Sequence, residues 1–538
     1  MNISVKALMV MSAFALASPA LAASPMAGEK LADDQTFTYS IIDEFTSVDP
    51  QIVEDVSGSD IIRDLFEGLF NQDKDGNLVP GVATSYDVSD DKLTYTFHLR
   101  DNAKWSDGKP VTAGDFVYAW RRLADPETAS PYQWFISIMS LANGDEVMAG
   151  DKPVEELGVK AIDDQTLEVT LSQPLPYFVL TTTHASTFPT PKWVIDEHGV
   201  DWTKPGNIVS NGAYVLTEHV PNERSVRERN PMYWNNDETV IEKVTALVIN
   251  DENIALQRYL AGELDRTGVP TGQYPTLKEQ YPDQAVSVPS LCSYYYMFNL
   301  RDDAPEWQKD VRVRKALSYA IDRGIIVDKI LQGGQIPAYT FTPGATAGFT
   351  VPQVDYAGMT QDERNAAAKA MMEEAGFGMG SPLDVTLVYN TSEGHKKIAI
   401  AVSQMWKQTL GVNVTLENME WKTFLQARSN GDFDVARGGW CGDYNEASTF
   451  LDLVTTNSGY NDSKYSNAEV DQLMADAKTA DDPQPNYTRV EEILAEDMPI
   501  IPIYHYASVF MLNPQLKGWP YDNVEQNWYS REFYKVAE

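Results

Sequence analysis

The segment VARGGWCGDYNEASTFL, residues 435–451, combines glycines, aromatic residues, both signs of charge and one of the two cysteines in the chain. Gly438, Gly439 and Gly442 have no side chain, so they leave the backbone open to close approach by another chain. Arg437 and Asp443 place a positive and a negative charge in the same stretch. The segment therefore suits a zwitterionic ligand with separated charged ends.

The two cysteines are Cys292 and Cys441. In an oxidising compartment, two cysteines in one soluble chain favour a single disulfide, and two free buried thiols are the alternative. Tyr294 to Tyr296 follow Cys292, while Trp440 and Tyr444 flank Cys441. A disulfide would bring these aromatic segments together, either as part of a binding surface or as an ordinary aromatic core.

The N-terminus has the features of a secretory signal peptide. Lys6 provides a positive charge, Ala7 to Ala17 is almost entirely apolar, and Ala20-Leu21-Ala22 matches the small-x-small pattern that signal peptidase recognises. The apolar run is too short to span a bilayer, and a buried N-terminal helix is the alternative. No cysteine follows it, so we expect no lipid anchor. The sequence predicts an exported protein whose signal peptide, residues 1–22, is cleaved near Ala22.

Length and charge narrow the class of protein further. The chain has 538 residues and a net charge of -36, from 42 lysines and arginines against 78 aspartates and glutamates. About 515 mature residues exceed what one hydrophobic core usually holds, so two or three domains are expected. The acidic charge disfavours nucleic acid and anionic lipid as partners, although a solvated acidic surface explains it without any ligand.

Hydrophobic periodicity predicts a mixture of strands and helices. Apolar and polar residues alternate over residues 93–100 and again over 167–171, as in half-buried strands. Helical spacing occurs over residues 313–320 and 470–477, and Ser466 with Glu469 suggests a capping box before the second of these. Thr360 with Glu363 predicts another capped helix, which ends near Gly376. Since no repeat or low-complexity linker divides the chain, we expect interleaved domains.

Several catalytic and metal-binding signatures are absent. The sequence contains no GxxxxGK[ST] phosphate loop, no HExxH zinc helix and no GxSxG nucleophile elbow. Its six histidines are scattered, and one cysteine pair cannot form a tetrahedral cysteine site. These absences favour a binding protein with no catalytic residues, metal or cofactor over an enzyme.

Five stretches carry a resemblance to a known family. They are RDLFEGLF (63–70), TFHLRDNAKWSDGKPVTAGDFVYAWRRLADP (96–126), NGAYVL (211–216), GHKKIAIAVSQMWKQTLGVNVTLENMEWKTF (394–424) and VARGGWCGDYNE (435–446). Together they resemble the periplasmic oligopeptide-binding proteins of ABC importers, which are family-5 solute-binding proteins. The match is colinear over essentially the whole mature chain.

The resemblance implies an α/β, two-lobed periplasmic binding protein fold of class II, with three interleaved domains that close about a hinge. Domain I would comprise residues 23–66, 192–291 and 509–538. Domain II would be an insertion, residues 67–191, and domain III would span residues 292–508. The chain would cross between lobes near Cys292 and Tyr506.

The resemblance also implies a set of ligand contacts for an extended peptide whose backbone pairs with strand edges. Asp443 would hold the terminal ammonium of the peptide, since a buried ammonium needs a charged acceptor. Arg437 and His395 would meet its C-terminal carboxylate. Strand edges at Glu54 and Val56, and at Gly439, Trp440 and Cys441, would pair with its backbone. The side-chain pockets would contain Tyr132, Trp421, Arg428, Trp440 and Tyr506.

Two positions depart from the family pattern. Leu331 stands where a lysine typically meets the C-terminal carboxylate, and Gly268 stands where a pocket tyrosine is expected. The first bears on which peptide lengths are held tightly, and the second implies a larger or rebuilt pocket.

The function implied is a monomeric periplasmic carrier of short peptides, which delivers them to an inner-membrane ABC permease and its ATPase. A carrier for a specialised ligand, such as a cell-wall (murein) peptide, is the alternative, because Leu331 suggests that the C-terminal end is recognised differently. An exported peptide hydrolase has no support from any nucleophile or metal motif.

Overall fold

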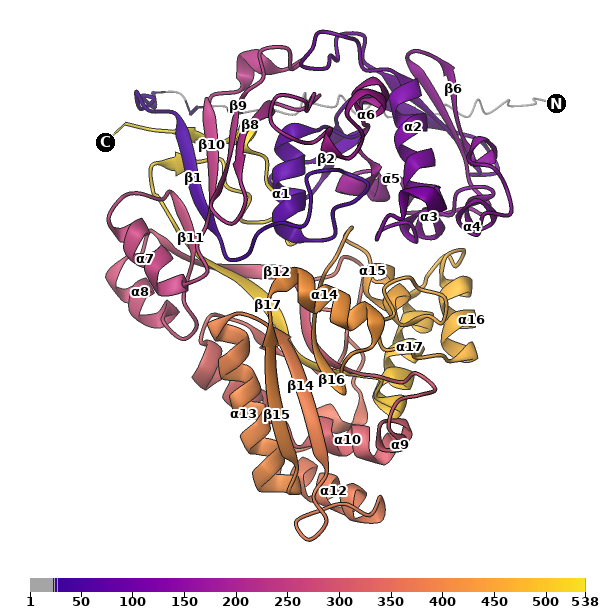
Figure 1. The fold of residues 1–538 in the computed structure, drawn as a ribbon, viewed down its shortest axis with the longest axis vertical. Helices are drawn as coiled ribbons and strands as arrows, with labels where there is room; N and C mark the ends of the chain where they lie inside the picture. Colours follow the sequence, from indigo (N-terminus) through magenta and orange to yellow (C-terminus); the bar gives the residue numbers. More distant parts are fainter. Residues whose placement is uncertain (1–22, 24, 27, 538) are drawn as a thin grey trace, which may run out of the picture.

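A mixed sheet of eleven strands runs through the length of the molecule in the computed structural model (Figure 1), which describes residues 23, 25–26 and 28–537. The predicted signal peptide lies outside these residues. Apart from β13 (Ile336–Pro337), which pairs with β17, the strands follow one another in a single order. That order is β15 (Asn413–Met419), β14 (Asp384–Asn390), β16 (Val435–Cys441), β12 (Ala285–Phe298), β17 (Ile500–Leu512), β11 (Arg266–Gly268), β1 (Thr36–Ile41), β10 (Lys243–Val248), β9 (Arg224–Arg229) and β8 (Tyr214–Val220).

Two long antiparallel strands, β12 and β17, join the two halves of this sheet. At one end, β17 pairs with β11 and leads to β1 in the upper part of Figure 1. At the other end, β12 pairs with β16 and leads to β14 and β15 in the lower part. The pairing of β12 with β17 is irregular between Pro289 and Ser293, close to Cys292. The chain therefore passes between the two parts along β12 and β17.

The upper part contains a second, four-stranded antiparallel sheet. Its order is β4 (Ala83–Val88), β5 (Thr94–Leu99), β7 (Thr166–Thr170) and β6 (Val159–Asp163), and helix α2 (Ala113–Ala124) packs against β6 and β7. Tyr95, Phe97 and Leu99 of β5 are buried, while the residues between them are half-buried. The alternation over residues 93–100 and 167–171 thus predicts both strands correctly.

The predicted helices are also present, with one correction. Residues 313–320 fall in α10 (Val311–Tyr319) and its C-cap, and the Thr360–Glu363 capping box opens α12 (Gln361–Glu374), which ends before Gly376. Helix α16 (Ala468–Ala477) begins differently, because Asn467 accepts the backbone N–H groups of Glu469 and Val470. The predicted capping role of Ser466 is therefore wrong.

The remaining helices and short strands complete the two parts. Those of the upper part are α1 (Val56–Leu65), β2 (Phe70–Gln72), β3 (Leu78–Pro80), α3 (Phe135–Ile138), α4 (Gly144–Met148), α5 (Phe178–Thr181), α6 (Lys192–His198), α7 (Glu252–Leu260), α8 (Tyr274–Gln280), β18 (Leu516–Lys517) and β19 (Tyr534–Lys535). Those of the lower part are α9 (Glu306–Lys309), α11 (Arg323–Ile325), α13 (Glu393–Leu410), α14 (Trp421–Asn430), α15 (Ser448–Leu451) and α17 (Gln484–Asp497).

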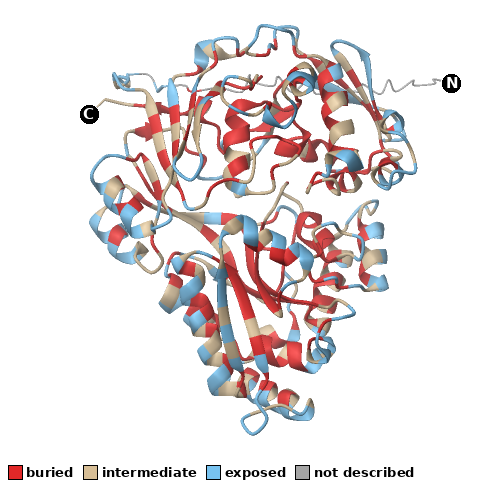
Figure 2. Ribbon diagram, viewed as in Figure 1, coloured by how far each residue is buried: buried red, intermediate tan, exposed pale blue. Residues whose placement is uncertain are grey.

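Buried residues concentrate on the central strands and on the inner faces of the helices (Figure 2). The C-terminal tail returns to the upper part, where Asp64 of α1 accepts the backbone N–H and the hydroxyl of Ser530. The same carboxylate lies 3.3 Å from the guanidinium of Arg227 on β9, and both side chains are fully buried. Removing one partner of such a buried pair typically costs about 3–5 kcal/mol. The Asp64 carboxylate therefore holds α1, β9 and the C-terminal tail together.

Candidate functional site

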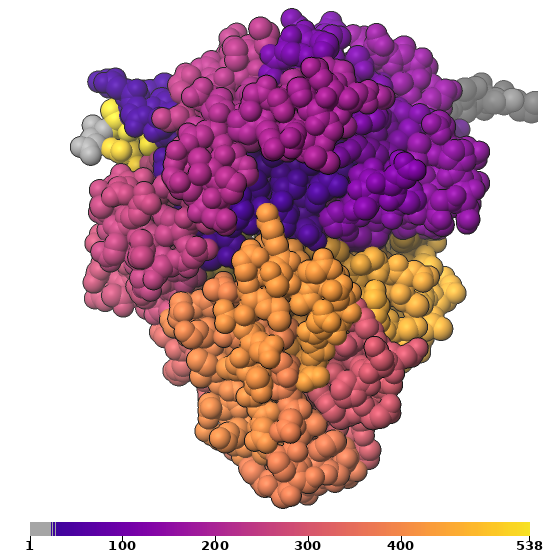
Figure 3. Space-filling model, in the orientation of Figure 1, coloured from indigo at the N-terminus to yellow at the C-terminus, as the bar shows by residue number. Residues whose placement is uncertain are grey.

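A cavity of about 530 Å³ lies between the upper and lower parts, which meet across the middle of the molecule (Figure 3). Its walls come from segments on both sides of the boundary. They include every predicted binding residue, namely Glu54, Val56, Tyr132, His395, Trp421, Arg428, Arg437, Gly439, Trp440, Cys441, Asp443 and Tyr506. The predicted residues, although spread over more than 450 positions of sequence, are brought together in one place.

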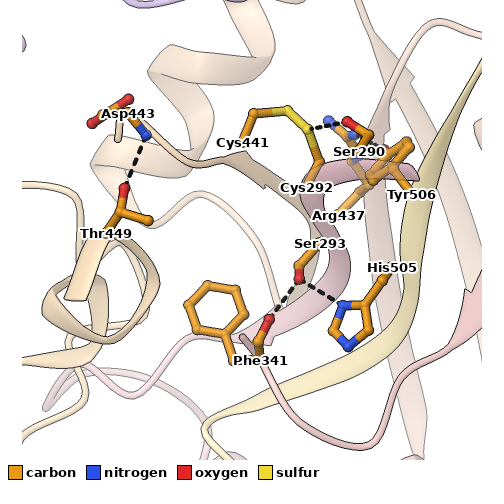
Figure 4. The surroundings of a disulfide bond; sticks show 10 residues. All are labelled: Ser290, Cys292, Ser293, Phe341, Arg437, Cys441, Asp443, Thr449, His505 and Tyr506. Atoms are coloured by element: carbon orange, nitrogen blue, oxygen red, sulfur yellow. Dashed lines mark hydrogen bonds between the residues drawn. A yellow bond between two sulfur atoms is a disulfide. The ribbon is translucent and has the colours of Figure 1, made fainter. Parts of the chain in front are cut away.

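Cys292 and Cys441 form a disulfide, which excludes the alternative of two free thiols. They face each other on the paired strands β12 and β16, and Figure 4 shows Asp443 just beyond the end of β16. The backbone N–H of Asp443 donates to Thr449 Oγ1 at 2.9 Å. The disulfide and this hydrogen bond hold the cavity-facing end of β16 in place.

One edge of β16 is open towards the cavity. The strand pairs with β12 along its whole length, but on its other side it pairs with β14 only at Val435 and Ala436. From Arg437 to Cys441, this second edge has no strand partner among the described residues. It therefore offers free backbone donors and acceptors to an extended ligand.

The glycines of β16 make room for neighbouring side chains. A Cβ at Gly438 would lie 2.3 Å from the ring of Tyr295, and one at Gly439 would lie 2.5 Å from Arg437 Nη2. Any other residue would displace the tyrosine ring or the guanidinium. The glycines thus keep the strand accessible and also let the Arg437 side chain lie against it.

Asp443 is a buried carboxylate with neutral neighbours. Its side chain is 8% exposed, the Tyr132 hydroxyl donates to Oδ1 at 3.4 Å, and His184 Nε2 lies 3.4 Å from the same oxygen. Burial lowers the pKa of His184 to about 3, so its imidazole is neutral. The backbone N–H of Ser186 donates to His184 Nδ1, which leaves the ring proton on Nε2, facing Asp443.

No lysine or arginine of the described residues forms an ion pair with Asp443. Burial therefore raises the pKa of its carboxyl well above the usual range. A cation that enters the cavity and hydrogen-bonds to this carboxylate would remove the desolvation penalty. Asp443 is thus a vacant acceptor for a positively charged group.

The opposite charge in the cavity is Arg437. Its Nη2 donates to the Tyr506 hydroxyl at 2.7 Å, its Nη1 lies 3.5 Å from Asn390 Oδ1, and its Nε is buried without a partner. Burial, together with the charge of Arg437, lowers the pKa of His395 well below its usual value, so this imidazole is neutral. Arg437 has no carboxylate within ion-pair distance among the described residues. Its guanidinium is therefore free to bind an anionic group.

Two predicted contacts need correction or refinement. Glu54 and Val56 do not lie on a strand edge, because Glu54 is in an irregular segment and Val56 is the first residue of α1, whose N-cap is Asp55. Arg428 lines the cavity, but its guanidinium is held by Asp462, with hydrogen bonds of 2.7 and 3.0 Å. Its charge is therefore already balanced.

The two departures from the family pattern lie outside the cavity wall. Leu331 is buried in the hydrophobic core of the lower part, and Gly268 pairs with Phe510 on β17. A Cβ at Gly268 would meet no atom within 4 Å, so open space surrounds this position.

Sequence reasoning missed several residues of the cavity wall. They are chiefly Asp43, Arg63, His184, Asn390, Tyr460 and Glu525. Arg63 opens the stretch RDLFEGLF, to which no binding role was assigned, and no quoted motif contains the other five.

The described residues show neither of two other kinds of site. They contain no group of three or more histidine, cysteine, aspartate or glutamate side chains placed to hold a metal ion. None of their helices has the length and apolar character needed to cross a membrane.

Fold and cavity together define a class of protein: a ligand-binding protein whose two α/β parts, joined by crossing strands, enclose a cavity with a free acidic end and a free basic end. The chain belongs to the bacterial extracellular solute-binding proteins, family 5 (Middle), whose model matches residues 77–462. The two-lobed α/β fold implied by the sequence is thereby confirmed.

Individual relatives are similar over nearly their full lengths. The periplasmic oligopeptide-binding protein OppA of Escherichia coli is 47% identical over 532 residues, which are 98% of this chain and 97% of the relative. The structure of the E. coli murein tripeptide-binding protein MppA has a TM-score of 0.92 at 46% identity, and that of Haemophilus influenzae OppA with the peptide RPPGFSPFR has one of 0.90 at 40% identity. Each covers 94% of this chain and 100% of its own.

A second structure of MppA, described as its unliganded open form, has a TM-score of only 0.69 at the same 46% identity. Because identity is the same in both comparisons, the difference reports how the parts are arranged rather than how the sequences diverge. The present structure therefore differs from that open arrangement. The contacts of Tyr132 and His184 with Asp443, which cross between the upper and lower parts, agree with a closed state.

Proposed function

We propose that this protein captures short peptides in extended form in the cavity between its two lobes and delivers them to an ABC-type peptide importer. One observation carries the proposal: the free edge of β16 lies between an unpaired buried carboxylate, Asp443, and an unpaired buried guanidinium, Arg437. A peptide supplies an ammonium, a carboxylate and a backbone that can extend along a strand edge.

Residue roles follow from the chemistry of the two ends. Asp443 binds the terminal ammonium, and Arg437 binds the terminal carboxylate with His395 beside it. Side chains lie in pockets formed by Tyr132, Trp421, Trp440 and Tyr506, with the Arg428–Asp462 pair as a neutral polar wall. Since recognition relies on the backbone and ends, water in the pockets would let side chains vary.

The surrounding biology is part of the proposal. The relatives are named as periplasmic proteins, and the N-terminus has the pattern of a cleaved signal peptide. We assign the mature chain to the periplasm as a monomer without enzymatic activity, and its partner to an inner-membrane permease complex. We keep the three-domain division at residues 66/67, 191/192, 291/292 and 508/509, with β12 and β17 as the hinge strands.

Blocking the ligand's amino terminus tests the assignment directly. We expect tri-alanine to bind and N-acetyl-tri-alanine to bind at least about 100-fold more weakly, because acetylation removes the cation and leaves Asp443 buried without a partner. Isothermal titration calorimetry measures both affinities. Equal affinities for the two peptides would refute the role of Asp443 at the ammonium end.

A murein peptide remains the specific alternative, favoured by the high similarity to MppA. Mass spectrometry of ligand released from the purified protein separates the two functions. A mixture of unrelated peptides supports a general carrier, whereas a single cell-wall peptide supports the alternative.

Asp443 should also control closure of the empty protein. Closing without ligand buries an ionised carboxylate with no cation, so we expect the empty wild-type protein to remain open at neutral pH. Because the pKa of Asp443 is raised in the closed form, protons bind preferentially to that form, and lowering the pH towards the usual carboxyl range should favour closure. Small-angle X-ray scattering should therefore show a smaller radius of gyration at low pH.

The matched variant for this experiment is Asp443→Asn, which removes the charge while keeping the shape. We expect the empty variant to be more closed than wild type at neutral pH, and to respond less than wild type to acidification, because Asp443 no longer titrates while Glu525, another cavity carboxyl whose pKa burial raises, still does. A variant that stays as open as wild type at neutral pH would contradict this mechanism.

A further inference from the structure

Glu525 is a cavity residue for which the resemblance assigns no role. It lies in the C-terminal tail, in a loop over residues 523–527 that runs beside the hinge strand β12, where the Leu291 N–H donates to the Val524 carbonyl at 2.6 Å. The loop belongs to the upper part, but it reaches the same cavity wall as Asp443 of the lower part.

Gln72 of β2 fixes the orientation of the Glu525 carboxylate. Its Nε2 donates to Glu525 Oε2, while its Oε1 accepts from Asn527 Nδ2 at 2.8 Å and from Asn523 Nδ2 at 3.3 Å. These two donors determine which end of the Gln72 amide faces Glu525. One oxygen of Glu525 is thereby held, and the other, Oε1, is buried with no hydrogen-bond partner among the residues that the structure describes.

The neighbours of Glu525 leave it without a direct cation. The guanidinium of Arg63, whose charge acts to lower the pKa of Glu525, is paired with Asp60, and no ion pair joins Glu525 to any described residue. Burial raises the pKa of Glu525 to about 7, and the charge of Glu525 in turn helps to raise that of Asp443. Both carboxylates line the same cavity, and one ligand ammonium can neutralise only one of them.

We propose that Asp443 and Glu525 form a two-carboxylate pocket that selects peptides whose first residue has a cationic side chain. Asp443 takes the terminal ammonium, and Glu525 Oε1 accepts a hydrogen bond from the side-chain ammonium or guanidinium of the same residue. This specificity rests on the proposed peptide-binding function and adds a preference at one ligand position. Glu525 acts there as a specificity-determining residue, positioned by Gln72.

A comparison of two near-isosteric peptides measures the preference in the wild-type chain. Lys-Ala-Ala and norleucine-Ala-Ala differ at the first side chain mainly in the terminal ammonium of lysine. We expect Lys-Ala-Ala to bind about tenfold more tightly or better, which is the usual scale of a charge-assisted hydrogen bond at a buried site. Ala-Lys-Ala, compared with Ala-norleucine-Ala, should show no such preference, because Glu525 lies near the ammonium site.

Glu525→Gln removes the charge and keeps the shape, and we expect it to reduce the lysine-to-norleucine affinity ratio to about one. Asp522→Asn is the matched control, because Asp522 is on the same tail segment but exposed and outside the cavity wall. It should leave the ratio at its wild-type value. Unfolding midpoints for both variants show that any change in the ratio occurs in folded protein.

Three results would overturn the inference: equal affinities for the two peptides in wild type, an unchanged ratio in Glu525→Gln, or an equal preference for lysine at the second position. None of these requires that peptide binding itself be lost. Failure of both norleucine and lysine peptides to bind would instead refute the proposed function, so the two failures are distinguishable.

Discussion

Asp443→Asn should weaken the binding of a short peptide such as tri-alanine by at least about 100-fold. The asparagine side chain can still accept a hydrogen bond from the ligand's ammonium, but the ammonium would be buried without a counter-charge. Leaving one member of a buried ion pair unpaired typically costs about 3–5 kcal/mol, and each 1.4 kcal/mol is a factor of ten in affinity. Titration calorimetry at neutral pH measures this loss directly.

The control for that experiment is Asp432→Asn, the same chemical change at an exposed position just before β16 and outside the cavity wall. It should bind tri-alanine as wild type does. A second comparison sharpens the assignment: N-acetyl-tri-alanine should bind Asp443→Asn at least as tightly as it binds wild type, because it has no ammonium to lose and the variant has no carboxylate to bury unpaired. If Asp443→Asn binds tri-alanine as tightly as wild type does, another residue holds the amino terminus.

Hydrophobic alternation and capping residues correctly predicted the strands and helices whose formation depends on residues close together in the sequence. Strand β5 follows from alternation because one face of it packs on a core and the other does not, so burial imposes a period of two. The start of α12 follows from Thr360 and Glu363, since the capping box satisfies backbone groups within three residues. Neither conclusion requires knowledge of the rest of the fold.

Prediction failed where two local solutions compete. Ser466 and Asn467 are adjacent residues of the kind that caps helices, and the structure uses Asn467, whose Oδ1 reaches the N–H groups of Glu469 and Val470. Around Glu54 and Val56, Asp55 caps α1 by accepting the Gly58 N–H, so a helix begins where a strand edge is expected. In the first case the cap lies one residue later than predicted, and in the second a helix start replaces the expected strand edge.

Sequence reasoning could not find the residues that depend on long-range pairing. His184 reaches Asp443, and Gln72 orients Glu525 from 453 positions away in the chain. Their contacts exist only because the cavity lies where separate segments of the upper part meet the lower part. The family resemblance placed Asp443 and Arg437 in the cavity because their motif is local, while Glu525 carries no motif at all.

The disulfide offers the second large effect. Replacing Cys292 and Cys441 together by alanine should lower the free energy of unfolding by about 5 kcal/mol, because the bond closes a loop of 149 residues and restricts the unfolded chain accordingly. The bond also ties β16 to β12, one of the two strands that join the upper and lower parts, beside the cavity wall. Guanidinium denaturation of the double variant and of oxidised wild type, followed by fluorescence and circular dichroism, measures the difference.

Reduced wild-type protein separates the covalent bond from the loss of the two sulfur atoms. Both cysteines stay in place on reduction, so packing around Cys292, which is 7% exposed, is nearly preserved while the loop opens. We expect the reduced protein to unfold at a denaturant midpoint close to that of the double variant and well below that of the oxidised protein. If the reduced and oxidised proteins share a midpoint while the variant is destabilised, sulfur packing rather than chain restriction accounts for the effect. Peptide affinity measured on the same samples then tells whether the covalent link also sets the geometry of Gly439 to Asp443, since a purely entropic bond would leave it unchanged in the folded protein.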